Sequence, residues 1–171
     1  MKQSFQSLHQ LTYQEQLPAS VILSRANSVN GNVVLSDTRG DANVRTTNGN
    51  ITVNNSKGLI DAKTTNGSIN ILGDSSVKEV GTTNGSIKAS LPENVVNPTN
   101  ISTINGSVEI LFPQSLNAEI EMRTVNGRIS AEGIQMTLNT ISSKHIVGTL
   151  GSGGQKVSVR TVNGNINLIK K

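Results

Sequence analysis

The chain contains no cysteine and no tryptophan, and its 171 residues include only two phenylalanines and one tyrosine. Without cysteine it can form neither a disulfide nor a thiolate metal site, and it suits a reducing or an oxidising compartment equally. With so few aromatic side chains, the core has to be filled by isoleucine, valine and leucine. No apolar run reaches the ~18 residues that a membrane-spanning helix requires, so no membrane span is expected.

The charge balance is mildly basic. Fifteen Lys and Arg residues stand against eleven Asp and Glu residues, which gives a formal net charge of +4. Such a balance favours anionic partners without identifying one. Because no aromatic residues interleave with the charges to stack on bases, a specific nucleic-acid partner is not expected.

One hexapeptide recurs through the chain. It reads TTNGNI from Thr46, and related copies begin at Ser28, Thr64, Thr82, Thr103, Thr124 and Thr161. The successive Asn residues are 18, 18, 18, 21, 21 and 37 positions apart, and the last step corresponds to two units with one signature missing. A fixed period of this length is typical of a repeat architecture. The pairs predicted to form structural turns are Asn30-Gly31, Asn48-Gly49, Asn66-Gly67, Asn84-Gly85, Asn105-Gly106, Asn126-Gly127 and Asn163-Gly164.

Apolar and polar residues alternate with period two on both sides of each Asn-Gly pair. Around Asn48, the residues Val44, Thr46, Ile51 and Val53 share one face. The same phase holds in the other copies, so each unit is predicted to be strand, corner, strand, with Thr and Ile facing inward.

Two arrangements fit this unit: a β-hairpin with a type I′ turn, or the corner of a solenoid. Equal spacing and one residue type at one phase favour stacked coils, each on the one before it in the chain, in which Asn lies over Asn and side-chain amides form a ladder. The sequence therefore predicts an all-β fold, a single-stranded parallel β-helix (β-solenoid) of about eight coils of 18–21 residues. Right-handed coiling is the default, and glycine at the corner is expected to provide positive φ.

The prediction divides the chain into an N-terminal leader and cap over residues 1–27 and a solenoid over residues 28–171. The two 21-residue coils carry proline-bearing insertions at residues 91–100 and 112–119, which are expected to form bulged corners on one side. In the stretch without a signature, Lys144 and His145 are predicted to replace Asn and Gly in an irregular coil, whose role the sequence does not define.

The repeats, together with the ending Gly148–Gly154 followed by Val157–Ile166, resemble a bacterial family of unknown function with T-x-N-G-x-I strand repeats. Members of this family are labelled adhesins and include LiaG-like envelope proteins. The resemblance extends from about Ser28 to the C-terminus. It implies a parallel β-helix and export to the periplasm or cell surface. The Gln-rich start has no apolar signal core, so export would mean that a signal segment is absent from this sequence; a cytoplasmic location is the alternative.

The position before the inward Thr forms a basic column that faces outward by parity. Its charged members are Arg45, Lys63, Arg123 and Arg160, and Gly81 and Ser102 complete it. Stacked like charges repel unless counter-ions or a polyanion neutralise them. This column could therefore contact a phosphate-rich polymer or an anionic membrane surface, or it could serve as a solvated edge that discourages aggregation.

Other candidate sites find less support. The carboxylates Asp37, Asp41, Asp61 and Asp74 do not share a repeat phase, whereas glycoside hydrolysis needs two facing carboxylates. The two imidazoles, His9 and His145, belong to no metal-ligand or nucleophile pattern. No metal or cofactor is predicted. A Thr array facing outward would suit ice binding, but the neighbouring position changes from Thr to Ile and Val along the chain.

The sequence thus predicts a non-enzymatic structural or binding module of the bacterial cell envelope, an adhesin-like scaffold. Its expected partners are an anionic polymer, a glycan or an envelope protein. The alternatives are a carbohydrate-binding or carbohydrate-active β-helix and an ice-binding solenoid. The oligomeric state is not predicted.

Overall fold

The computed structural model describes residues 2–3, 22–23, 25–73, 75–131 and 133–171. Most of the predicted leader, His9 and Asp74 lie outside the described residues. Everything described is strand, turn or irregular chain, and no helix in these ranges could span a membrane.

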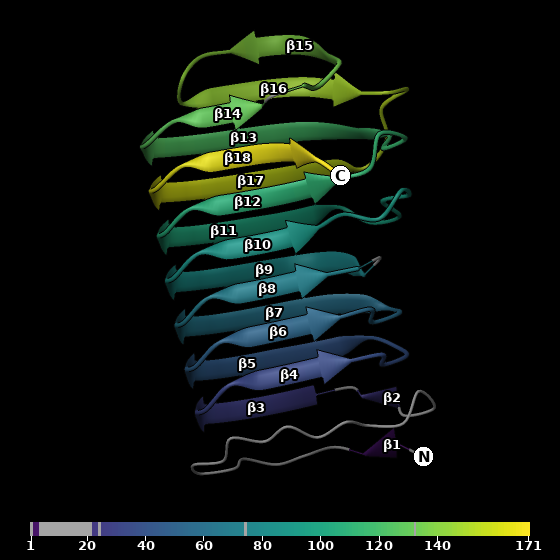
Figure 1. Cartoon of the computed structure of the whole chain (residues 1–171), viewed down its shortest axis with the longest axis vertical. Helices are drawn as coiled ribbons and strands as arrows, with labels where there is room; N and C mark the ends of the chain where they lie inside the picture. Colours follow the sequence, from purple (N-terminus) through teal and green to yellow (C-terminus); the bar gives the residue numbers. More distant parts are fainter. Residues whose placement is uncertain (1, 4–21, 24, 74, 132) are drawn as a thin grey trace.

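The strands form two walls that run the length of a stack (Figure 1). The nine-stranded sheet comprises, in spatial order, β15 (Met136–Ile141), β16 (His145–Leu150), β13 (Ala118–Asn126), β17 (Lys156–Asn163), β11 (Thr99–Asn105), β9 (Ser76–Asn84), β7 (Leu59–Asn66), β5 (Ala42–Asn48) and β3 (Arg25–Asn30). The seven-stranded sheet comprises β14 (Ile129–Ala131), β18 (Ile166–Lys170), β12 (Val108–Phe112), β10 (Ile87–Ser90), β8 (Ile69–Leu72), β6 (Ile51–Asn54) and β4 (Val33–Ser36). A separate short pair joins β1 (Lys2–Gln3) and β2 (Ile22–Leu23).

The core lies between the two walls and is built from aliphatic side chains. Ile51, Ile69 and Ile87 are parallel register partners on β6, β8 and β10, and all three are fully buried. Stacking identical side chains at one phase lets branched aliphatic residues fill a narrow interior without aromatic rings. The predicted all-β, β-solenoid-like fold with parallel strands is confirmed.

The Asn residues at the corners form the predicted amide ladder. The Nδ2 of Asn48 donates to Oδ1 of Asn30, that of Asn66 to Asn48, and that of Asn84 to Asn66, each at 2.8 Å. The ladder continues through the remaining corners, where Asn105, Asn163 and Asn126 follow in spatial order. Each coil is thereby held in register with the next by a side-chain hydrogen bond as well as by backbone pairing.

The corner glycines meet the predicted torsional requirement only in part. Gly31, Gly67 and Gly85 have positive φ of 156–157°, whereas Gly49, Gly106, Gly127 and Gly164 fall outside the positive-φ set. Instead, a Cβ at Gly49 would overlap the carbonyl oxygen of Gly31 in the neighbouring coil, and the other three corners repeat this close approach. The coils stack so tightly at these corners that no side chain fits, a steric requirement that holds whether or not φ is positive.

The inward Thr column is buried, as predicted. The Oγ1 of Thr46 donates to the carbonyl oxygen of Gly31 at 3.2 Å, and that of Thr103 donates to Gly85 at 2.9 Å. Each hydroxyl therefore satisfies a corner carbonyl of the adjacent coil, which removes the cost of burying it.

The C-terminal coil does not lie at the end of the stack. Strand β17 pairs on one side with β11 and on the other with β13, both in parallel, and β18 lies likewise between β12 and β14. Figure 1 shows this coil in yellow between teal and green neighbours. The expectation that coils stack in sequence order is wrong here. Every signature unit presents the same pairing edges and ladder groups, so a late copy can occupy an interior position without loss of register.

The predicted irregular coil around Lys144 and His145 is also wrong. Strands β15 and β16 form an antiparallel hairpin, and β16 pairs antiparallel with β13. At its turn, the Oγ of Ser142 accepts from the amides of Lys144 and His145. The estimate of about eight coils included this segment, which instead extends the nine-stranded sheet two strands beyond β13.

The two proline-bearing insertions form loops at one side of the stack, as expected. They lie between β10 and β11 and between β12 and β13, and they meet in a parallel bridge between Asn94 and Asn117. Leu91 and Leu116 point inward from these loops and are buried. The insertions thus add apolar cover at this edge of the core.

Candidate functional site

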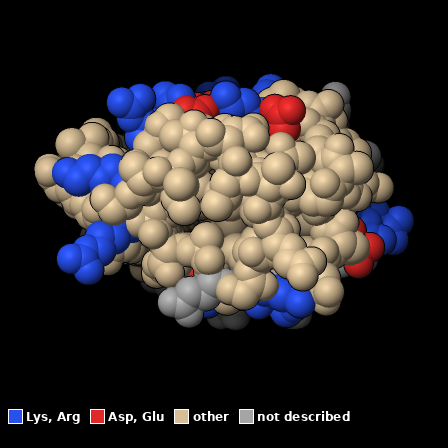
Figure 2. All heavy atoms as spheres, turned by 90° about the horizontal axis from the view of Figure 1, so that it is seen from above, with Lys and Arg blue, Asp and Glu red and all other residues tan. Residues whose placement is uncertain are grey.

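The basic column lies on the outward face of the nine-stranded sheet. Strand pairing places its members in the spatial order Arg45, Lys63, Gly81, Ser102, Arg160, Arg123. Because β17 is inserted before β13, Arg160 and Arg123 are direct register neighbours, although 37 positions separate them in the chain. In an end-on view, the Lys, Arg, Asp and Glu side chains of the molecule as a whole lie mainly around its rim (Figure 2).

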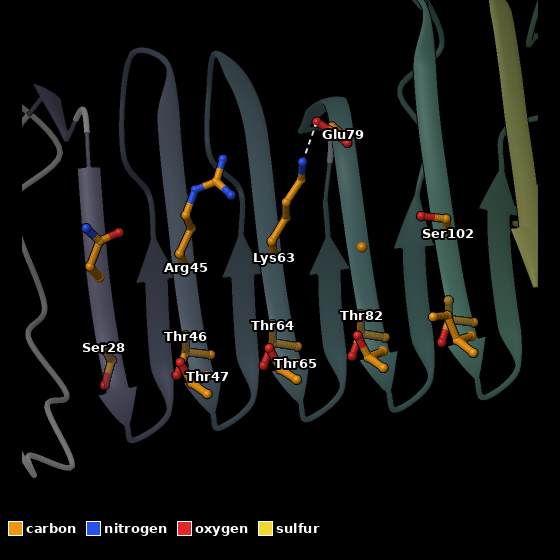
Figure 3. Close-up of a pocket in the computed structure, with 15 residues that line it drawn as sticks. Ser28, Arg45, Thr46, Thr47, Lys63, Thr64, Thr65, Glu79, Thr82 and Ser102 are labelled. Atoms are coloured by element: carbon orange, nitrogen blue, oxygen red, sulfur yellow. Dashed lines mark ion pairs between the residues drawn. The ribbon is translucent and has the colours of Figure 1, made fainter.

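An open groove runs along this face over β3 to β11 and has a volume of about 680 Å³. Figure 3 shows its lining, with Thr47 on β5, Thr65 on β7 and Ser102 on β11, and the long side chains of Arg45 and Lys63 beside them. Hydroxyl groups and cations therefore line a hollow that follows the axis of the stack. Such a hollow suits an extended polar chain better than a compact small molecule, which is usually held in an enclosed, largely apolar pocket.

Gly81 forms part of the groove floor, and neither sterics nor backbone torsion requires glycine there. A Cβ at this position would meet the Oγ of Ser102 at 3.5 Å and its carbonyl oxygen at 3.7 Å, both ordinary contacts, and Gly81 is not among the glycines with positive φ. Glycine inside a strand costs stability and often marks a place where a ligand or another backbone approaches closely. The hollow at Gly81 is thus a property of the sequence that the fold itself does not demand.

The first two cations of the basic column, Arg45 and Lys63, each lie close to a carboxylate. Arg45 Nη2 lies 3.7 Å from Asp61 Oδ2, and Lys63 Nζ lies 2.7 Å from Glu79 Oε2. Asp61 Oδ2 also accepts from the side-chain amide Nδ2 of Asn43 at 3.4 Å. This half of the column is close to electrically neutral.

The other half of the column surrounds a single half-buried carboxylate, Glu121. Its oxygens lie 2.7 Å from Lys156 Nζ, 3.6 Å from Arg160 Nη2 and 3.7 Å from His145 Nε2. The hydrogen bond from Lys156, with the positive charges of Lys156, Arg160 and His145, lowers the pKa of Glu121 below its ordinary value, against the opposing effect of desolvation.

Sequence reasoning missed Glu121 and Lys156. Glu121 holds the same repeat phase as Asp61, five positions before its corner Asn, so the phase could have indicated an acidic partner beside the basic column. Lys156 and His145 carried no such signal, because their proximity depends on the inserted coil and on the hairpin.

An exposed apolar row lies beside the two arginines. Ile104, Val162 and Val125 occupy neighbouring strands β11, β17 and β13, two positions beyond Ser102, Arg160 and Arg123. The same row continues as Thr47, Thr65 and Thr83 on the earlier strands. Because the other Thr column is buried and this one gives way to Ile and Val, no uniform Thr surface extends along the described face.

A second groove, of about 550 Å³, lies on the outward face of the seven-stranded sheet. It is lined by Thr52, Asn70 and Asn167, with Lys88 and Glu109 in contact at 2.6 Å. It therefore has polar walls but no row of cations.

The remaining sequence candidates are scattered. Asp41 accepts from the amide of Leu59 at 2.8 Å, Asp61 belongs to the pair with Arg45, and Asp37 sits at a turn with φ of 54°. Within the described residues, no three His, Asp or Glu side chains are grouped to hold a metal ion. Asp74 and His9 lie outside those residues.

The fold and the groove define a β-solenoid-like repeat protein with an open polar face. The Toastrack DUF4097 family matches residues 24–169, and the chain belongs to this family. Among curated proteins, none matches the chain. A solved structure described as a "putative cell adhesion protein from Clostridium sporogenes ATCC 15579" is similar at a TM-score of 0.39 and 14% identity. The match covers 78% of this chain and 57% of that one, so the chain spans little more than half of that protein's length.

Proposed function

We propose that this protein is a non-enzymatic binding module of the bacterial cell envelope, adhesin-like in the manner of LiaG-like proteins, that holds an extended polymer along the outward face of its nine-stranded sheet. The observation that carries the proposal is the groove over β3 to β11, with its row of hydroxyls and its unrequired glycine. A glycan or an anionic polymer matches its length and polarity.

The stacked ladders make this face suitable for binding without rearrangement. Asn side chains link successive corners at 2.7–2.8 Å, and buried Thr hydroxyls link each strand to the adjacent corner. A ligand that meets a face already held in one geometry avoids the entropic cost of ordering it. Rigid presentation of repeated polar groups is what an adhesion or scaffolding role requires.

The direct test is to fill the groove. Gly81→Leu introduces a side chain where the backbone tolerates one, and should weaken binding to the cognate polymer on a glycan and polyanion array by at least about tenfold through exclusion of the ligand. Thr52→Leu, on the groove of the opposite sheet, is the matched control and should leave binding unchanged. If Gly81→Leu binds every polymer on the array as the parent does, the proposed function is wrong.

An export signal encoded upstream of residue 1, tested by fusion to a secreted reporter, checks the envelope location.

A further inference from the structure

The two arginines brought together by the inserted coil form an arrangement that the rest of the column does not share. Arg123 and Arg160 are parallel register partners on β13 and β17. Adjacent parallel strands are ~4.8 Å apart, so like charges directly opposite each other repel. Glu121 offsets this only in part, because its shortest contact, 2.7 Å, is with Lys156, whereas Arg160 lies at 3.6 Å.

The charged side chains around the two arginines show the same excess of positive over negative charge. Lys156 is the register partner of Glu119 on the outward face, whereas Lys144 lies level with Thr124, whose side chain points inward. The three outward cations Arg123, Arg160 and Lys156 thus lie beside two carboxylates, Glu119 and Glu121. Among the described residues, no carboxylate lies within 4 Å of Arg123. At the other end of the column, Arg45 and Lys63 each have a carboxylate within 4 Å.

A third observation concerns His145, the register partner of Arg123 on β16. Its Nε2 is buried and has no hydrogen-bond partner, although Glu121 is 3.7 Å away. A buried nitrogen without a hydrogen bond is uncommon, and the charged group nearest to this one is Glu121. The nitrogen lies within the same cluster of cations.

We propose that Arg123 and Arg160, supported by Lys156 and His145, form an anchor for the phosphate groups of a linear phosphate-bearing polymer. Guanidinium groups bind phosphate through paired N–H donors, and one phosphate between the two arginines removes their repulsion. The anchor lies in line with Ser102 and Gly81, so a chain held at the arginines continues into the groove. This inference rests on the proposed function and specifies the ligand class for the same face.

The position of the anchor favours a polymer over a membrane surface. The cations and the groove follow one line along the stack, which suits a linear chain, whereas a bilayer would engage the whole face. The carboxylates Asp61 and Glu79 beside the groove would also lie against an anionic bilayer. A polymer anchored at the arginines can place its uncharged portions there.

Two double variants with equal charge change test the anchor. The first, Arg123→Ser with Arg160→Ser, should weaken binding to long-chain inorganic polyphosphate at least about tenfold and make its salt dependence shallower. The second, Arg45→Ser with Lys63→Ser, removes two cations of the groove wall that are already paired with carboxylates, and should weaken binding by a clearly smaller factor than the first. Thermal unfolding of both variants verifies that each is folded.

The outcomes separate the alternatives. Equal weakening by the two double variants overturns the anchor, because it would show diffuse attraction to the whole face. Preference for polygalacturonate over polyphosphate overturns the phosphate assignment. Binding to phosphatidylglycerol vesicles without binding to polyphosphate overturns the polymer in favour of a membrane surface. If Gly81→Leu abolishes polymer binding and the arginine variant does not, the proposed function is supported and the arginine anchor is wrong. If the arginine variant abolishes binding and Gly81→Leu does not, the groove is not the binding site and the anchor is supported.

Discussion

The side-chain amide of Asn163 donates to Oδ1 of Asn105 at 2.7 Å across 58 residues of sequence. The same ladder joins Asn126 to Asn163 at 2.8 Å across 37 residues. The last coil therefore stands between two coils that precede it in the chain. This order determines which parts of the protein stabilise one another, and it creates the arginine pair.

Removing core volume from the inserted coil should affect coils on both sides of it. Ile166 is fully buried and pairs with Val108 and Ile129. We expect Ile166→Ala to cost about 2–5 kcal/mol of unfolding free energy and to lower hydrogen-exchange protection on both β12 and β14. Ile51→Ala, the matched control, should lower protection mainly on β4 and β8, its own neighbours. Undiminished protection on β12 in the Ile166 variant would contradict the inserted order.

Two glycine substitutions should have opposite effects. A Cβ at Gly106 would overlap the carbonyl oxygen of Gly85, so Gly106→Ala should destabilise the protein by about 2 kcal/mol or more through forced separation of two coils. Gly81→Ala adds a Cβ at ordinary contact distance from Ser102 and reduces the freedom of the unfolded chain, so it should stabilise by up to about 1 kcal/mol. Urea unfolding of the two variants measures both values. Equal effects would mean that the corners do not pack as closely as the structure indicates.

The Glu121 cluster should make stability depend on pH in a defined direction. Because the hydrogen bond from Lys156 and the nearby cations lower the pKa of Glu121 on folding, its ionised form stabilises the folded state above the ordinary value of 4.5. That contribution is lost as pH falls through the lowered value. Glu121→Gln should thus be less stable than the parent at pH 7, and the difference should close in more acidic solution. Glu109→Gln, in the exposed pair with Lys88, serves as the control and should show a smaller gap at pH 7. A difference in unfolding free energy between Glu121→Gln and the parent that stays constant with pH would refute the stabilising role of ionised Glu121.

The repeat phase made much of the fold predictable. Once Asn-Gly defines the corner, period two places Val44 and Ile51 inside and Arg45 outside, and the structure confirms each. The fold class and the insertions followed from the same pattern. The handedness of coiling and the boundary at residue 28 stay predictions.

The order of the coils could not be read from the pattern. Pairing edges that are alike in every unit cannot specify which unit is next to which, and in the observed order the hairpin β15–β16 pairs with the remaining edge of β13. The neighbourhood of Arg123, Arg160 and Glu121 depends on that order, so the most charged part of the candidate site was visible only as separate residues. The paired half, around Arg45 and Lys63, lies in consecutive coils and was correctly aligned.

The inserted coil also determines where a tether would leave the molecule. The amide of Lys171 donates to the carbonyl oxygen of Phe112 at 2.8 Å, which brings the C-terminal residue out on the flank of the stack, well below its upper end (Figure 1). A linker or partner domain fused after Lys171 would project sideways from the rod. Copies joined in tandem through this terminus would branch from one another's flanks, and would not align end to end into one longer rod.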